Sequence, residues 1–452
     1  MENVFERYSV NKLIFMFSTP AIFSLMLESL TSVIDTAFAG RLGEMSENAI
    51  SAMGVLNPLI SMLIAAQLVF GVSTSIMIAK GKGEKSEERI NNSFKVGYYS
   101  SIMLSSFISL IIYLFHEKLL TIIGANGIVR ELAKDYLLIA LITNVFSSVG
   151  YTLVNNVRAF GYPKMEMFIT FTATIINISL NVLFTFKLDM GLVGIGLATL
   201  ISEIYYAVLS GGFLLHKKLW FKKSKLRVEQ YRETLTSLVK IGFVQFFIQS
   251  LSSIGGFIFN RTILYYSNIS YVGVWSIAQK THSVLILPLV GLTQGIQSVI
   301  AYYDGSNNDK RKQEVVKKSI LYSLIYGVFI TIIIIGFTDF VARLFTTDNS
   351  LIVQSNPVIK VSFIAFPLMG IIYTFISLMQ ISNREVEAMT IGFLRQIGIL
   401  IPLVILLPWI FSRTNILGIE PKFSIFFALP ISDIIVTIIA VILNKQNSIK
   451  SK

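Results

Sequence analysis

Long apolar runs, separated by short polar segments, alternate along the whole chain. A helix needs roughly 20 mainly apolar residues to cross the hydrocarbon core of a bilayer. Runs of that length predict twelve membrane-spanning helices, near residues 13–39, 51–79, 96–115, 136–157, 165–186, 190–215, 238–265, 271–303, 319–342, 352–381, 388–411 and 423–444. The predicted fold class is therefore an all-α polytopic membrane protein.

Lysine and arginine concentrate in every second connecting segment. Cytoplasmic loops of membrane proteins carry an excess of these two residues. With the N-terminus in the cytoplasm, most of the 38 lysines and arginines lie in inward-facing segments: the N-terminus, 80–95, 158–164, 216–235, 304–318, 382–387 and the C-terminus. An even number of helices returns the chain to its starting side. We expect a multi-pass protein of the cell (plasma) membrane with cytoplasmic N- and C-termini.

Short motifs of the first half recur, in the same order, in the second half. Ile122–Asn126 resembles Leu344–Asp348, and Leu200–Glu203 resembles Pro430–Asp433. Two homologous halves of six helices each have the same orientation, and a pseudo-twofold axis along the membrane normal relates them. We expect an N-terminal six-helix bundle, a basic cytoplasmic linker and a C-terminal six-helix bundle, over residues 1–215, 216–235 and 236–452.

Composition supports a membrane protein and excludes several functions. Apolar residues make up 54% of the chain and charged residues 14%, whereas a soluble domain carries about a quarter charged residues. The net charge of +12 comes from basic residues beside apolar runs, which indicates a membrane surface and not nucleic acid. There is no cysteine, the three histidines are dispersed, and no zinc-protease, serine-hydrolase or ATPase motif occurs. We therefore expect neither an enzyme nor a cofactor.

Ionisable residues inside the apolar runs need a reason, because each costs roughly 2.5–3.5 kcal/mol at the bilayer centre. Asp35 is the strongest functional candidate, since aspartate is too short to reach the headgroups. An apolar environment favours the protonated form of a carboxylate, which suits a group that takes up and releases a cation. Glu28 lies seven residues earlier on nearly the same helical face. The alternative for Asp35 is a structural hydrogen bond.

Polar side chains on the fifth and sixth predicted helices extend this candidate site. Asn177 and Asn181 lie one turn apart, as do Thr199 and Glu203. Amide and hydroxyl oxygens beside a carboxylate suit sodium or a shared proton. The alternative is interhelical hydrogen bonding, which is common in membrane bundles.

The role of three further charged residues, structural pairing or transport, is left open by the sequence. Glu203 and Asp433 occupy equivalent positions of the repeat. They fit a structural pairing that involves Arg395 as well as they fit a transport role.

The sequence resembles the MATE (multidrug and toxic compound extrusion) family over nearly its whole length. The resemblance lies in motifs that occur in the family's order: Pro20 with Val33–Gly43, Asn57-Pro58, Gly71 with Gly81, Arg158–Pro163, Pro288–Gly291 with Gln294-Gly295 and Gln297, Tyr303–Ser306, Arg395-Gln396 with Pro402, and Pro430–Asp433. It implies a secondary active multidrug efflux transporter that exports organic cations and amphipathic compounds by antiport with H⁺ or Na⁺. Its partners would be small molecules and the lipid bilayer, and it would act as a monomer.

The resemblance also implies a cation-coupling site formed by Asp35, Asn177, Asn181 and Thr199. The family has an aspartate where this chain has Asn181, so only one certain negative charge remains. This departure implies weaker sodium binding, at Asp35, Asn177 and Thr199, and favours a proton cycle on Asp35.

The chain is more similar to the DinF and MepA branches than to the NorM branch. NorM proteins place acidic residues in the seventh and tenth helices, whereas here the seventh carries Gln249–Ser252 and the tenth has no Asp or Glu. The main alternative function is a flippase for a lipid-linked or polysaccharide precursor, which belongs to the same superfamily.

Overall fold

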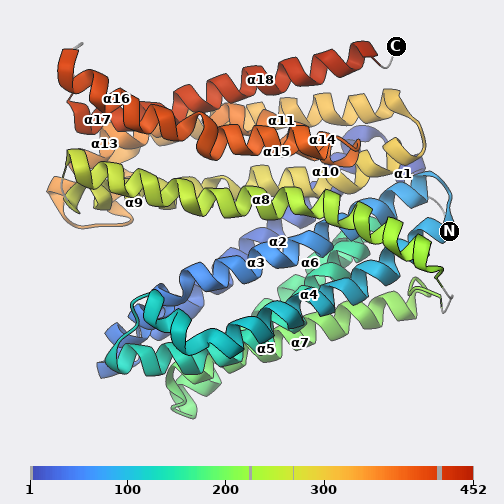
Figure 1. The fold of residues 1–452 in the computed structure, drawn as a ribbon, viewed down its shortest axis with the longest axis horizontal. Helices are drawn as coiled ribbons and strands as arrows, with labels where there is room; N and C mark the ends of the chain where they lie inside the picture. The colour runs from blue at the N-terminus through green and yellow to red at the C-terminus, as the bar shows by residue number, and fades with distance from the viewer. Residues whose placement is uncertain (1–3, 223–225, 268, 415–419, 451–452) are drawn as a thin grey trace. The chain divides into compact units, whose positions relative to one another are not determined.

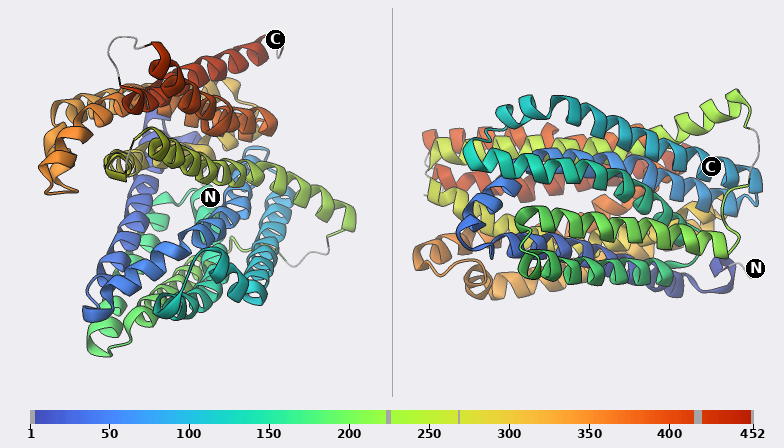
Figure 2. Two further views of the ribbon diagram at one scale, coloured as in Figure 1. Left: turned by 60° about the vertical axis from the view of Figure 1, so that its left-hand side comes forward. Right: turned by 90° about the horizontal axis from the view of Figure 1, so that it is seen from below.

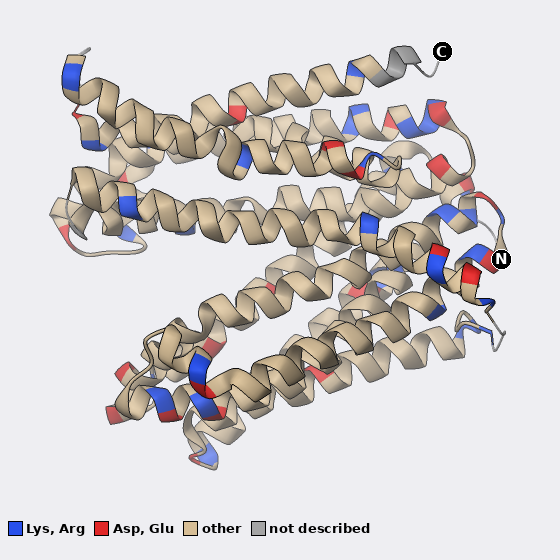
Figure 3. Cartoon of the chain, viewed as in Figure 1, with Lys and Arg blue, Asp and Glu red and all other residues tan. Residues whose placement is uncertain are grey.

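The structure is a computed structural model that describes residues 4–222, 226–267, 269–414 and 420–450. Long helices form almost all of it, and these residues contain no β-strand. Within the described residues, twelve helical segments are long and apolar enough to cross a membrane, which confirms the predicted number of spans. Figure 3 shows that lysine, arginine, aspartate and glutamate gather toward the helix ends, while the middles of the helices are nearly free of charge.

The first six spans are mostly single helices after the short α1 (Val4–Arg7). They are α2 (Val10–Ala39), α3 (Ser46–Gly83), α4 (Glu87–Ile122), α5 (Gly127–Ala159), α6 (Pro163–Val182) and α7 (Gly191–His216). A 3-10 turn, η1 (Gly43–Met45), precedes α3, and a π-helical turn, η2 (Leu183–Lys187), continues α6. Several helices extend past the predicted apolar runs. The added first turns carry charged residues, which are not part of an apolar run; Glu87 and Glu88 in α4 are an example.

The last six spans contain more interruptions. The helices are α8 (Val228–Tyr266), α9 (Ile269–Leu285), α10 (Leu287–Gly305), α11 (Asp309–Gly336), α12 (Thr338–Arg343), α13 (Asn349–Phe363), α14 (Met369–Ile381), α15 (Glu385–Phe393), α16 (Leu400–Thr414), α17 (Pro421–Ser424) and α18 (Ala428–Lys450). The 3-10 turns η3 (Phe366–Leu368) and η6 (Ile425–Phe427) and the π turn η4 (Leu394–Gly398) lie within spans.

Proline accounts for two of these interruptions. Pro288 follows the break between α9 and α10, and Pro367 lies in the turn between α13 and α14. Proline has no backbone N–H, and its ring clashes with the carbonyl four residues earlier. The predicted single run 271–303 is therefore two helices, which together form one span.

The chain divides into two compact units. Unit 1 comprises Met1–Phe246 and Ser298–Arg311, and unit 2 comprises Phe247–Gln297 and Lys312–Lys452. Unit 1 thus also contains the start of α8 and the end of α10. The predicted boundaries at 215 and 236 follow the sequence repeat, and they stay a prediction.

Unit 1 is packed closely enough for backbones to touch. In the right-hand view of Figure 2 its helices, coloured blue to green, run lengthwise beside one another. A Cβ atom on Gly83 would lie 2.1 Å from the carbonyl oxygen of Tyr302, so only glycine allows α3 and α10 to meet there. Lys80 and Asp304 form an ion pair of 2.7 Å beside this contact. The ring of Phe5 in α1 stacks on Tyr302 with 4.4 Å between centroids.

Unit 2 has its own apolar core. Phe259, Phe363, Phe366 and Phe426 are buried in it, and Trp275 stacks on Phe259 with 4.5 Å between ring centroids. Large aromatic side chains from five elements thus hold this unit together.

Candidate functional site

Asp35 lies near the C-terminal end of α2 and is only 6% exposed. Asn181 of α6 donates a hydrogen bond from Nδ2 to Asp35 Oδ1 at 2.6 Å, and Thr199 of α7 donates one from Oγ1 to Asp35 Oδ2 at 3.3 Å. Asn177 completes the group, since its Oδ1 accepts from Asn181 Nδ2 at 3.0 Å and its Nδ2 donates to Thr199 Oγ1 at 3.3 Å. The structure therefore brings together all four residues that the sequence analysis selected. We call Asp35, Asn177, Asn181 and Thr199 the Asp35 cluster.

The Asp35 cluster is rich in oxygen atoms and poor in positive charge. No lysine or arginine bonds Asp35 in the part of the chain that the structure describes. Asn181 Oδ1 is buried and accepts no hydrogen bond. Buried acceptors normally have a partner, so an unpaired one needs an explanation. Carboxylate, amide and hydroxyl oxygens are the ligands that hard cations prefer, and a bound Na⁺ or H⁺ would compensate this acceptor and the charge of Asp35.

The helix that carries the two asparagines changes its winding directly beyond them. Residues 183–187 form the π turn η2, and such turns occur frequently at functional sites. Thr185 lies on this turn, four residues after Asn181, and its buried Oγ1 has no hydrogen-bond partner. The sequence analysis did not select Thr185, although its spacing from Asn181 equals that between the two asparagines.

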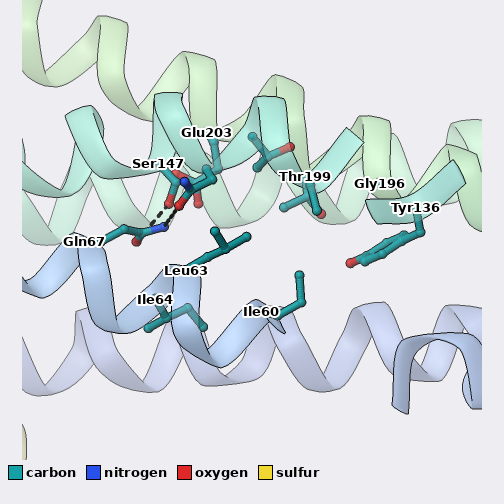
Figure 4. Close-up of a pocket in the computed structure, with 12 residues that line it drawn as sticks. Ile60, Leu63, Ile64, Gln67, Tyr136, Ser147, Gly196, Thr199 and Glu203 are labelled. Carbon is teal, nitrogen blue, oxygen red and sulfur yellow. Dashed lines mark hydrogen bonds between the residues drawn. The ribbon is translucent and has the colours of Figure 1, made fainter. Parts of the chain in front are cut away.

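A cavity of about 170 Å³ lies beside the Asp35 cluster, within unit 1 (Figure 4). Thr199 belongs to both, because its Oγ1 bonds Asp35 and its side chain lines the cavity. Glu203, one turn further along α7, also lines it and is partly buried. The full lining is Ile60, Leu63, Ile64, Gln67, Tyr136, Ala140, Thr143, Asn144, Ser147, Gly196, Thr199 and Glu203.

Glu28 belongs to the same polar region of unit 1. It lies on α2, two turns before Asp35, and interacts electrostatically with Glu203 and Glu166. Neither Glu28 nor Glu203 bonds an Asp35-cluster residue in the described structure.

Arg395 and Asp433 form a separate ion pair in unit 2. Arg395 Nε lies 3.0 Å from Asp433 Oδ1, and the side chains are 16% and 15% exposed. Arg395 also donates to Met369 Sδ at 3.0 Å and lies over the ring of Tyr373, 5.7 Å from its centroid. The pair lines a cavity of about 480 Å³ together with side chains of α8, α9, α14 and η4. Of the two repeat-equivalent acids, Asp433 is thus the one that pairs with Arg395.

Sequence analysis missed a buried ion pair at the start of α6. Arg158 NH1 donates to Glu166 Oε1 at 2.8 Å, and the two residues are 2% and 4% exposed. Arg158 also donates to the side chain of Asn155. Arg158 was assigned to a cytoplasmic loop because basic residues normally occur there. In the sequence, the turn at Gly161–Pro163 is the one feature that indicates contact between Arg158 and Glu166.

A family model described as MatE matches residues 20–183 and 244–406 of the chain. The multidrug export protein MepA of Staphylococcus haemolyticus is 25% identical over 413 residues, which is 91% of this chain and 90% of that protein. MepA of Staphylococcus aureus (strain MSSA476) is 25% identical over 417 residues, with the same coverage.

Solved structures show the same fold. A MOP superfamily transporter from Pyrococcus furiosus aligns with a TM-score of 0.87 and 20% identity over 98% of this chain and 97% of that one. The binding pocket of that transporter has a reversed polarity, which suggests a different function for it. A MATE structure in complex with MaL6 aligns with a TM-score of 0.88 and 20% identity over 99% of both chains.

Proposed function

Because the chain belongs to the MatE family of membrane transporters, we propose that it is a secondary active multidrug efflux transporter that exports amphipathic organic cations in exchange for H⁺ or Na⁺. It is a multi-pass membrane protein and not an enzyme. Its MepA relatives are named multidrug export proteins. These names support outward transport and small-molecule substrates.

The observation that carries the proposal is the isolation of the Asp35 carboxylate. It is buried on a helix long enough to span the bilayer, and among the residues that the structure describes only the neutral side chains of Asn181 and Thr199 bond it. A buried charge without a partner is unstable. Asp35 therefore alternates between a state with a bound cation and a state in which substrate leaves or enters.

One coupling ion supplies enough free energy for this exchange. A monovalent cation that moves inward gains about 2.3 kcal/mol per 100 mV, and one pH unit adds about 1.4 kcal/mol. Together these support a drug gradient of several hundredfold when coupling is tight. The single carboxylate of the Asp35 cluster favours H⁺ over Na⁺, since asparagine at 181 adds no charge.

The proposal includes an orientation and an oligomeric state. In the proposed orientation both termini lie in the cytoplasm, which the distribution of lysine and arginine between the loops supports. The Asp35 cluster and its cavity are built from the helices of unit 1 alone, which supports a functional monomer in the plasma membrane.

Dye efflux from proteoliposomes tests the function and the coupling ion together. A pH gradient and a sodium gradient are imposed separately, on the unchanged protein, on Asp35→Asn and on Asp189→Asn as a matched control. Asp189 lies in the exposed turn after η2 with φ +50°, a conformation that asparagine adopts readily.

We expect the pH gradient to drive efflux in the unchanged protein and the control, and Asp35→Asn to lose it while expressing at the same level. Undiminished efflux by Asp35→Asn would remove the coupling role. If no variant transports dye and the protein instead flips a lipid-linked precursor, the proposed function would be wrong and the protein would be a flippase.

A further inference from the structure

Glu203 is a partly buried carboxylate that the exchange at Asp35 does not use. It projects from α7 into the cavity of unit 1 shown in Figure 4. Its Oε2 is buried and accepts no hydrogen bond. Among the described residues that line the cavity there is no lysine, arginine or histidine. The cavity thus contains a negative group and no internal counterion.

The neutral polar groups around Glu203 bond one another, and Ser147 also hydrogen-bonds the Glu203 carboxylate. Gln67 Nε2 donates to Asn144 Oδ1 at 3.3 Å. Ser147 Oγ donates to Gln67 Oε1 at 3.3 Å, and both of these residues are labelled in Figure 4. Asn144 Nδ2 in turn donates to Ser109 Oγ at 3.1 Å. These bonds fix the amides, and Glu203 Oε2 remains buried without a hydrogen-bond partner among the described residues.

Size and lining favour an organic head group over a bare metal ion. A cavity of 170 Å³ is close to the ~150 Å³ that holds one benzene molecule. Ile60, Leu63 and Ile64 form an apolar wall, and Tyr136 adds an aromatic ring. Aromatic faces attract substituted ammonium groups, whereas Na⁺ requires a shell of oxygen ligands.

We propose that this cavity binds the positively charged head of an amphipathic ammonium substrate, with Glu203 as its charge partner. The proposal rests on the proposed function for the direction of transport, but it concerns a different step. Asp35 takes the coupling ion, and Glu203 takes the substrate.

Thr199 connects the two binding events. Its Oγ1 bonds Asp35 Oδ2, and it lies one turn from Glu203 on the same face of α7. A cation at Asp35 and an ammonium group at Glu203 repel each other across this turn, where few charges screen them. Loading one site therefore weakens the other, which is the requirement for exchange.

Binding measurements on the purified protein test this assignment without a transport assay. The probes are benzyltrimethylammonium and its uncharged isostere neopentylbenzene, in which carbon replaces nitrogen. The variants are Glu203→Gln and, as matched control, Glu131→Gln, whose side chain is exposed on α5. Ala140→Leu fills the cavity and leaves Glu203 in place, and thermal unfolding checks that each variant is folded.

We expect Glu203→Gln to weaken benzyltrimethylammonium at least tenfold and neopentylbenzene less than twofold, Ala140→Leu to weaken both probes, and Glu131→Gln to weaken neither. Equal affinity for the cation in Glu203→Gln and the unchanged protein would overturn the assignment, as would binding that Ala140→Leu leaves intact. Asp35→Asn separates the two proposals: it mimics the cation-loaded carboxylate, so it should still bind benzyltrimethylammonium, less tightly than the unchanged protein, while it loses driven efflux. Loss of cation binding in Glu203→Gln with driven efflux intact in Asp35→Asn would refute the coupling role and leave this site standing.

Discussion

Asn181 donates a hydrogen bond of 2.6 Å to Asp35 across 146 residues of sequence, and its own amide oxygen has no partner. The amide therefore neutralises part of the charge of Asp35 and at the same time offers an open ligand atom. An aspartate at the same position would offer ligand atoms but would repel Asp35. We therefore expect the side chain at residue 181 to set the ion selectivity of the proposed coupling site.

Replacing Asn181 with Asp should shift the site toward sodium. At 4 Å and an effective dielectric constant of 20, an added unit charge attracts a cation by about 4 kcal/mol, and repulsion between the two carboxylates offsets part of this gain. We expect Na⁺ to bind at least about tenfold more tightly, and sodium-driven dye efflux to appear. Isothermal titration with Na⁺ measures the affinity, with K⁺ as control. An unchanged Na⁺ affinity would show that residue 181 does not contact the ion.

Thr199 should be needed for its hydroxyl and not for its shape. Valine has the same outline but lacks the oxygen that bonds Asp35 Oδ2 and receives the amide of Asn177. We expect Thr199→Val to lower coupled efflux about tenfold or more, because two buried polar groups lose their partner at about 1–3 kcal/mol each. Thr199→Ser keeps the oxygen and should retain most activity in the same proteoliposome assay. Equal loss in both variants would instead indicate a packing defect.

Arg158 and Glu166 should contribute stability and not transport. Both are buried, and removing one partner leaves an uncompensated charge, which costs about 3–5 kcal/mol. Arg158→Met and Glu166→Gln alone should each lower the apparent unfolding temperature in detergent clearly, whereas the double variant should lose less than the sum of the two. Full additivity would mean that the pair does not interact. Variants that reach the membrane should keep the drug specificity of the unchanged protein.

The spans were predictable because their signal is local. Twenty apolar residues in sequence need a bilayer wherever they fold, so the twelve runs were confirmed with shifts at the charged ends. Asp35 was predictable for the same reason, since a lone aspartate in an apolar run is visible without a structure. Asn177, Asn181 and Thr199 were found through their spacing and the family resemblance. The structure places them around Asp35, and their role in coupling stays a prediction.

Other features depend on which atoms meet in three dimensions. Arg158 has the residue type and position of a cytoplasmic loop charge, and its burial follows only from the turn that brings Glu166 back to it. The unpaired Oε2 of Glu203 depends on how Gln67, Asn144 and Ser147 bond one another. The π turn after Asn181 has no composition signal, since Leu183–Lys187 resembles the apolar residues around it.

Arg395 and Asp433 should behave in the opposite way to Asp35, because the cation in this pair is covalently part of the chain. At 3.0 Å from Asp433, Arg395 compensates the carboxylate permanently, so no external ion needs to bind there. We expect Asp433→Asn to lower stability by leaving Arg395 unpaired, and the double variant Arg395→Met with Asp433→Leu to recover part of it, as buried pairs replaced by apolar residues often do. In both, the number of ions exchanged per dye molecule, measured from the reversal potential in proteoliposomes, should equal that of the unchanged protein. A changed ratio would make Asp433 a second coupling site, in which case the repeat equivalence with Glu203 would be functional in both halves.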